Sequence, residues 1–162
     1  VEILSGIESL KSLSLFDRSL TSRHVQQLMK LSNLEGLSYE GSLTPDDVGQ
    51  LSQRLSKLSF LAIRGEHLHE AAGQQLAKHA ALKGLNITGG TTVETLNGLA
   101  KLTQLQSLSI VATQPIVAAD WSRLQTLKKL LSLHLVADVA EETSKELQTQ
   151  LPNCKLTVTR PQ

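Results

Sequence analysis

A short apolar pattern returns along this chain at almost constant intervals. The pattern is apolar-x-x-apolar-x-apolar, and its copies begin 23 to 25 residues apart, at Leu10, Leu34, Leu58, Leu82, Leu105 and Leu130. A further, shorter copy, LPNCKL, begins at Leu151. Regular spacing of this length is typical of proteins in which each unit is too small to bury its own apolar face and stacks on its neighbours. We therefore predict one domain over residues 1–162, with about six repeats and a short C-terminal strand repeat.

Each repeat divides into a strand and a helix. The apolar-x-apolar core alternates as a half-buried strand does, which predicts strands over 12–15, 36–39, 60–63, 84–87, 107–110 and 132–135. Behind each strand, apolar residues recur three or four positions apart, as in Val25, Leu28 and Leu31. The stretch TPDD, which begins at Thr44, offers an N-cap, a proline at the first helical position and two carboxylates near the positive helix end. Gly89 and Gly90 after the fourth strand favour a turn with positive φ.

Stacked strand–helix units predict a curved α/β solenoid. Consecutive parallel strands should pair in chain order, with right-handed crossovers through the helices. Neighbouring strands lie about 4.8 Å apart, whereas packed helices need about 8–10 Å, so the helix side forms the longer arc. The parallel sheet is therefore expected on the concave face and the helices on the convex face.

Three unusual residues align with core positions of other repeats. Trp121 aligns with the helix residues Val25, Val48 and Leu96, which predicts that it fills the core. His79 replaces a leucine at a helix end, where it can offset the negative helix terminus. Cys154 aligns with the second strand leucine of the other copies and is expected to be a buried thiol.

Composition excludes several classes of protein. The chain has 162 residues, with 16 Lys and Arg against 15 Asp and Glu. This balance argues against nucleic-acid binding, which normally requires a basic stripe. No apolar run approaches the roughly 20 residues of a membrane helix. The single cysteine leaves the compartment open, with a lean to the cytoplasm. Since the first residue is Val1 rather than Met, we expect further sequence upstream.

The repeats resemble leucine-rich repeats, nearer the ribonuclease-inhibitor-like helical type than the plant or extracellular type. The stretch LHEAAGQQLAKHAALKGLNITGG, residues 68–90, carries the clearest likeness, and the closing LPNCKLTVT is similar to the ends of some bacterial repeat proteins. The resemblance covers essentially the whole chain. It implies a non-catalytic protein that binds a protein partner through its concave sheet.

Alternation along the strands places three columns of side chains on that concave face. The columns are Ser12, Gly36, Phe60, Gly84, Ser107 and Ser132; Ser14, Ser38, Ala62, Asn86, Ser109 and His134; and Phe16, Glu40, Arg64, Thr88, Val111 and Val136. Most of these side chains are small and uncharged. The aromatic and charged ones gather in the first three repeats, where binding energy can concentrate.

We therefore predict a protein-binding site in this N-terminal half. Its residues are Phe16, Glu40, Phe60 and Arg64 on the sheet, with Asp17, Arg18, Glu66 and His67 as a polar rim at the joints. Two alternatives stay open. The Phe60 ring either lies flat over Gly36 and Gly84 or anchors a partner. Glu40 and Arg64 either form a surface ion pair with each other or contact the partner.

Catalytic patterns are weak in this sequence. The pair His67 and His69 does not by itself define a tetrahedral metal site, and no phosphate loop or nucleophile elbow is present. We therefore expect no enzyme activity, cofactor, metal or small-molecule substrate. The alternatives to a protein-binding module are a structural spacer within a larger polypeptide and, less favoured, an enzyme.

Overall fold

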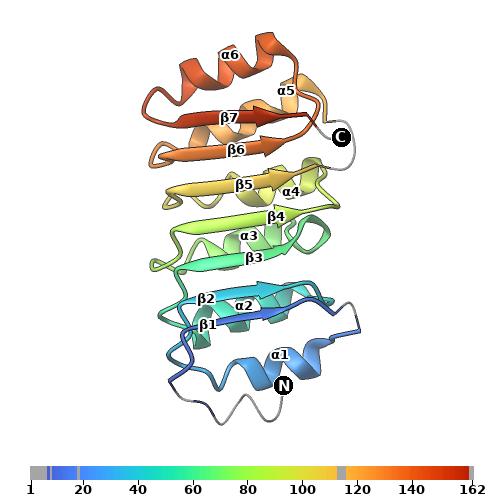
Figure 1. The fold of residues 1–162 in the computed structure, drawn as a ribbon, viewed down its shortest axis with the longest axis vertical. Helices are drawn as coiled ribbons and strands as arrows, with labels where there is room; N and C mark the ends of the chain where they lie inside the picture. Colours follow the sequence, from blue (N-terminus) through green and yellow to red (C-terminus); the bar gives the residue numbers. More distant parts are fainter. Residues whose placement is uncertain (1–6, 8, 18, 113–115, 161–162) are drawn as a thin grey trace.

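Strands and helices alternate along the whole described chain (Figure 1). The computed structural model describes residues 7, 9–17, 19–112 and 116–160. The strands are β1 (Ser12–Leu15), β2 (Gly36–Tyr39), β3 (Phe60–Arg64), β4 (Gly84–Thr88), β5 (Ser107–Val111), β6 (Ser132–Val136) and β7 (Lys155–Thr159). The α-helices are α1 (Ser22–Leu28), α2 (Pro45–Arg54), α3 (Glu70–Leu76), α4 (Val93–Leu99), α5 (Ala118–Trp121) and α6 (Glu141–Gln150). Two short 3-10 helices, η2 (Gly65–His67) and η3 (Ser122–Thr126), follow β3 and α5.

The strands form one parallel sheet whose order follows the chain from β1 to β7. Figure 1 shows them stacked along the long axis of the molecule, with most helices on one side of the sheet. The register places Leu37 opposite Leu61, Leu61 opposite Leu85 and Leu85 opposite Leu108. The predicted architecture and the first six predicted strands are therefore confirmed.

The core consists of leucine ladders that run between the sheet and the helices. Leu61, Leu85 and Leu108 are each 1% exposed, because each is covered by the equivalent leucines of its two neighbours and by the helix behind. Trp121 is also 1% exposed, so its predicted place in the core is confirmed. Tyr39 takes the position of a strand leucine, and burial, with a smaller effect from the Asp47 charge, raises the pKa of its hydroxyl to about 12.

The last strand begins later than predicted. Leu156, not Cys154, pairs with Leu133, so LPNCKL was aligned two residues too early along the strand. The amide of Cys154 donates to the Leu151 carbonyl at 3.0 Å, as the amide of Leu58 donates to the Leu55 carbonyl at 2.9 Å. Leu151 and Cys154 therefore close the turn after α6, as Leu55 and Leu58 close the turn after α2. The predicted burial of Cys154 is confirmed, because it is a free cysteine and 4% exposed.

Local signals at the helix starts and joints are confirmed. The hydroxyl of Thr44 accepts a hydrogen bond from the Asp47 amide at 3.2 Å, and Pro45 opens α2. Gly89 and Gly90 have φ values of 60° and 51°, which side chains with a Cβ rarely adopt. The buried ring of His79 donates from Nε2 to the Leu58 carbonyl at 2.7 Å, so this histidine ties the turn after α3 to the start of the same repeat.

Candidate functional site

The outward side chains of the sheet form the three predicted columns. The register places Phe60 between Gly36 and Gly84, and it places Ala62 between Ser38 and Asn86. Arg64 lies opposite Thr88, and the third column continues through Val111 to Val136. We use the term concave N-terminal face for the outward side of β1–β3 and the joints that follow these strands.

Two exposed aromatic rings mark the concave N-terminal face. Phe16 is 70% exposed directly after β1, and Phe60 is 40% exposed at the start of β3. The Phe60 ring leans over Gly84, where an added Cβ would lie 2.9 Å from Cδ2 of the ring. An added Cβ at Gly36 would instead meet the Ser12 hydroxyl at 3.3 Å. The ring thus covers one of its two glycine neighbours and keeps two fifths of its surface open.

A hollow of about 150 Å³ lies on this face beside Phe16. Its lining comprises Phe16, Ser38, Tyr39, Glu40, Ala62, Ile63, Asn86 and Thr88. Phe16 and Glu40 were predicted site residues, whereas Ser38, Ala62, Asn86 and Thr88 were recognised only as members of the columns. Their shared position on adjacent strands was the signal that could have identified them. The Oδ1 atom of Asn86 is buried and has no hydrogen-bond partner in the described structure.

One of the two alternatives for Glu40 and Arg64, a surface ion pair between them, is wrong. Arg64 instead binds Glu66, with Nε 2.6 Å from Oε1 and Nη2 3.2 Å from Oε2. The 3-10 turn η2 carries Glu66 back over the end of β3, and Gly90 leaves the space that the Glu66 carboxylate occupies. The hydrogen bond between the two side chains raises the pKa of Arg64 and lowers the pKa of Glu66. No ion pair of Glu40 is found among the described residues.

The predicted rim residues lie in different surroundings. Asp17 accepts a hydrogen bond from the Ser19 amide at 2.8 Å, which lowers the pKa of its carboxyl group, and it is exposed near Phe16. Arg18 lies outside the described residues. His67 is half-buried and makes hydrogen bonds to the backbone of Gly41 and Leu43, so its ring holds the preceding joint. Asp17 therefore extends the exposed surface, whereas the His67 ring is turned toward the backbone of the joint after β2.

The surroundings of His67 predict a loss of stability in mild acid. Burial lowers its pKa below the ordinary value of 6.5, and the Arg64 charge adds to this effect, while Glu66 and the two backbone hydrogen bonds oppose it. The unfolded chain then binds more protons, so this contribution is complete above pH 6.5 and is lost as the pH falls. Urea unfolding of the wild type and of His67→Gln should show a shallower decline below pH 6.5 in the variant. Equal slopes would contradict this assignment.

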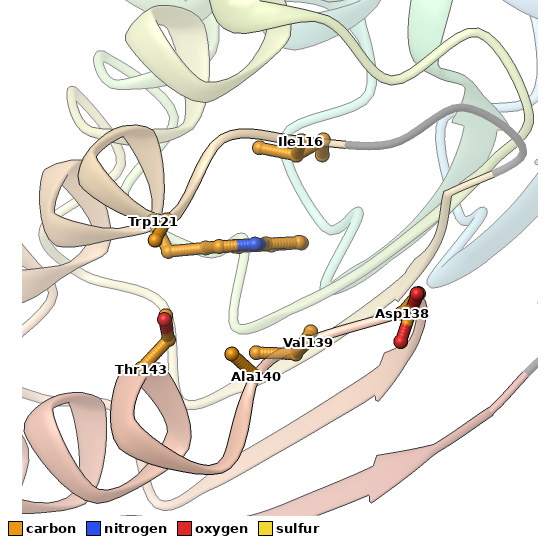
Figure 2. Close-up of a pocket in the computed structure, with 7 residues that line it drawn as sticks. Ile116, Trp121, Asp138, Val139, Ala140 and Thr143 are labelled. Atoms are coloured by element: carbon orange, nitrogen blue, oxygen red, sulfur yellow. The ribbon is translucent and has the colours of Figure 1, made fainter.

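A second hollow, of about 220 Å³, lies between α5 and the start of α6. Figure 2 shows the indole of Trp121 edge-on between Ile116 on one side and Val139 with Ala140 on the other. The indole Nε1 is buried without a hydrogen-bond partner in the described part of the chain. Sequence reasoning placed Trp121 in the core but missed this hollow, because the spacing gives no sign that α5 is only four residues long.

Membrane and metal sites were also sought in the described residues. None of the helices described for the chain is long and apolar enough to span a bilayer. Within the same residues, no three His, Cys, Asp or Glu side chains are grouped so that they could hold a metal ion.

Comparison with known proteins supports the fold. The sequence matches no protein-family model and no curated protein. Among solved structures, the chain is similar to the protein in a TLR13–ssRNA13 complex, with 20% identity and a TM-score of 0.57 over 96% of this chain and 23% of that one. It is also similar to the leucine-rich repeat-containing protein LegL7 from Legionella pneumophila, with 17% identity and a TM-score of 0.57 over 98% of this chain and 68% of that one.

These likenesses and the seven-stranded parallel sheet show that the chain has the leucine-rich-repeat fold. At 17% and 20% identity they define the fold, while ligands and partners differ from one such protein to another. The chain spans under a quarter of the first protein, at 23%, and about two thirds of LegL7, at 68%.

Proposed function

We propose that this chain is a non-catalytic protein-binding module whose partner docks on the concave N-terminal face. The leucine-rich-repeat fold typically mediates protein interactions, which supports the general role. The observation that carries the location is the pair of exposed rings, Phe16 and Phe60, on a sheet face where most side chains are small and uncharged. Aromatic side chains concentrate binding energy at protein interfaces.

The surroundings of the two rings favour close contact with another protein. Serine, glycine and alanine dominate the first two columns, so a partner can approach the backbone without displacing long charged side chains. Arg64 and Glu66 neutralise each other at the edge of this face, which reduces the cost of bringing them near a partner.

The RNA in the TLR13 complex belongs to that protein and does not extend to this chain. RNA binding relies on several cations that track the phosphate backbone. Here Arg64 is paired with Glu66, and Lys155 lies on β7 at the far end of the sheet. This distribution favours a protein partner over a nucleic acid.

Two equally exposed apolar residues allow a matched test of the site. Phe16 is 70% exposed on the concave N-terminal face, and Val117 is 69% exposed beside α5. Wild type, Phe16→Asp and Val117→Asp would each be used to capture proteins from native lysate, followed by quantitative mass spectrometry and affinity measurement. We expect a protein that binds wild type and Val117→Asp alike and binds Phe16→Asp at least about tenfold more weakly.

Phe60→Asp serves as a second variant on the same face. It should weaken the same interaction, and thermal unfolding of all variants separates lost binding from lost folding. If both phenylalanine variants bind the partner as tightly as wild type and Val117→Asp does not, the site lies elsewhere on the molecule.

A further inference from the structure

We propose that the hollow beside Phe16 receives an arginine side chain of the protein partner. This inference rests on the proposed function and specifies the chemistry of the same face. The occupant follows from the size of the hollow, its charge and the groups that line it.

The size of the hollow suits one long side chain. A volume of about 150 Å³ equals the liquid volume of about five water molecules. Pockets for drug-sized ligands run from about 300 to 1,000 Å³. The hollow is therefore too small for most cofactors and matches a single projecting residue.

The charge of the hollow favours a cation. Glu40 supplies the only ionisable carboxylate among the described lining residues, and none of the described ion pairs includes it. Among the described residues, Arg64 is a cation close enough for the Glu40 charge to act on it, and its guanidinium is bound to both oxygens of Glu66. Arg64 and Glu66 cancel each other in charge, so Glu40 gives the described lining of the hollow a net negative charge.

The remaining lining residues favour arginine over a simple ammonium group. The exposed ring of Phe16 offers a flat face on which a guanidinium can stack. Ala62 provides an apolar wall for the aliphatic stem. Ser38 and Thr88 add hydroxyl oxygens that can accept hydrogen bonds, and Asn86 lines the same hollow. A guanidinium carries five N–H donors in a planar arrangement, which suits several acceptors around one slot.

Amino-acid probes test this assignment without the partner. Isotope-labelled protein would be titrated with N-acetyl-arginine amide, with its uncharged isostere N-acetyl-citrulline amide and with N-acetyl-lysine amide, and the signals followed by NMR. We expect saturable shifts at Glu40, Thr88 and the Asn86 side-chain amide with arginine. Citrulline should bind at least about tenfold more weakly, because it lacks the charge-assisted hydrogen bonds.

Isosteric variants identify the carboxylate that is responsible. Glu40→Gln should weaken arginine binding at least about fivefold, whereas Glu142→Gln on α6 should leave it unchanged. Both variants should retain the wild-type spectrum elsewhere, which confirms folding. Equal binding of arginine and citrulline, or unchanged binding in Glu40→Gln, would overturn the proposal. If the arginine probe does not bind while a protein partner still docks on this face, only the arginine proposal is contradicted. If the arginine probe binds and no protein docks on this face, the proposed function is contradicted instead.

Discussion

Gly73→Ala is expected to destabilise the protein by about 3 kcal/mol, at the upper end of the usual cost of overpacking. Helices α3 and α4 approach each other through backbone at this point. A Cβ added to Gly73 would lie 2.5 Å from the Cα atom of Gly98, and it would also meet the Gly98 carbonyl group. Since backbone cannot rotate away as a side chain can, the two repeats must separate. Urea unfolding monitored by circular dichroism would measure the change.

Gly49 provides the matched control within a neighbouring helix. An added Cβ there would lie 3.3 Å from Cγ of Gln75, which belongs to a flexible side chain that can shift. Gly49→Ala should therefore be neutral or should stabilise by up to about 1 kcal/mol, because alanine favours helix over glycine. Similar losses from both alanine variants would contradict the close backbone packing of α3 on α4.

Leu85→Ala should cost about 2–5 kcal/mol, the range found when a buried leucine is truncated in a core that relaxes only partly. Leu85 is 1% exposed and lies between Leu61 and Leu108 on the adjacent strands. The cavity would open at the centre of the stack, and each repeat is stabilised mainly by its nearest neighbours. The loss should therefore also broaden the urea transition, as the two halves begin to unfold separately.

Ser109→Ala tests the same sheet from its other side. Ser109 lies one position beyond Leu108 and faces outward, opposite Asn86 and His134 on the neighbouring strands. Its replacement should change the free energy of unfolding by less than about 0.5 kcal/mol. A cost comparable with that of Leu85→Ala would show that the inward and outward residues have been assigned to the wrong faces.

The sequence predicted the strands and their register because one physical constraint sets both. A repeat of nearly constant length places equivalent leucines opposite each other, and alternation then determines which side chains face outward. The positions of Phe60 between Gly36 and Gly84, and of Ala62 between Ser38 and Asn86, followed from this alone. The last repeat was misaligned because leucines three apart occur in two places, at the helix end and at the strand start. Leu151 and Cys154 belong to the first of these.

The side-chain contacts of the site depend on joints that the repeat does not determine. Glu40 and Arg64 belong to the same column, which suggested an ion pair. The 3-10 turn after β3 instead brings Glu66 within 2.6 Å of Arg64, and such a turn follows no other strand among the described residues. The same irregularity turns His67 toward Gly41 and Leu43. Local geometry of this kind depends on individual side chains. The column pattern could therefore predict which side chains share the outward face, but not which of them form hydrogen bonds or ion pairs.

Site-specific photocrosslinking tests the location of the partner most directly. The photoreactive residue p-benzoylphenylalanine would replace Phe16, Phe60 or Val117 in otherwise wild-type protein, and each form would be irradiated in native lysate. Docking on the concave N-terminal face predicts one crosslinked product of the same mass from positions 16 and 60, and none of that mass from position 117. A product from position 117 alone would contradict docking on the concave N-terminal face.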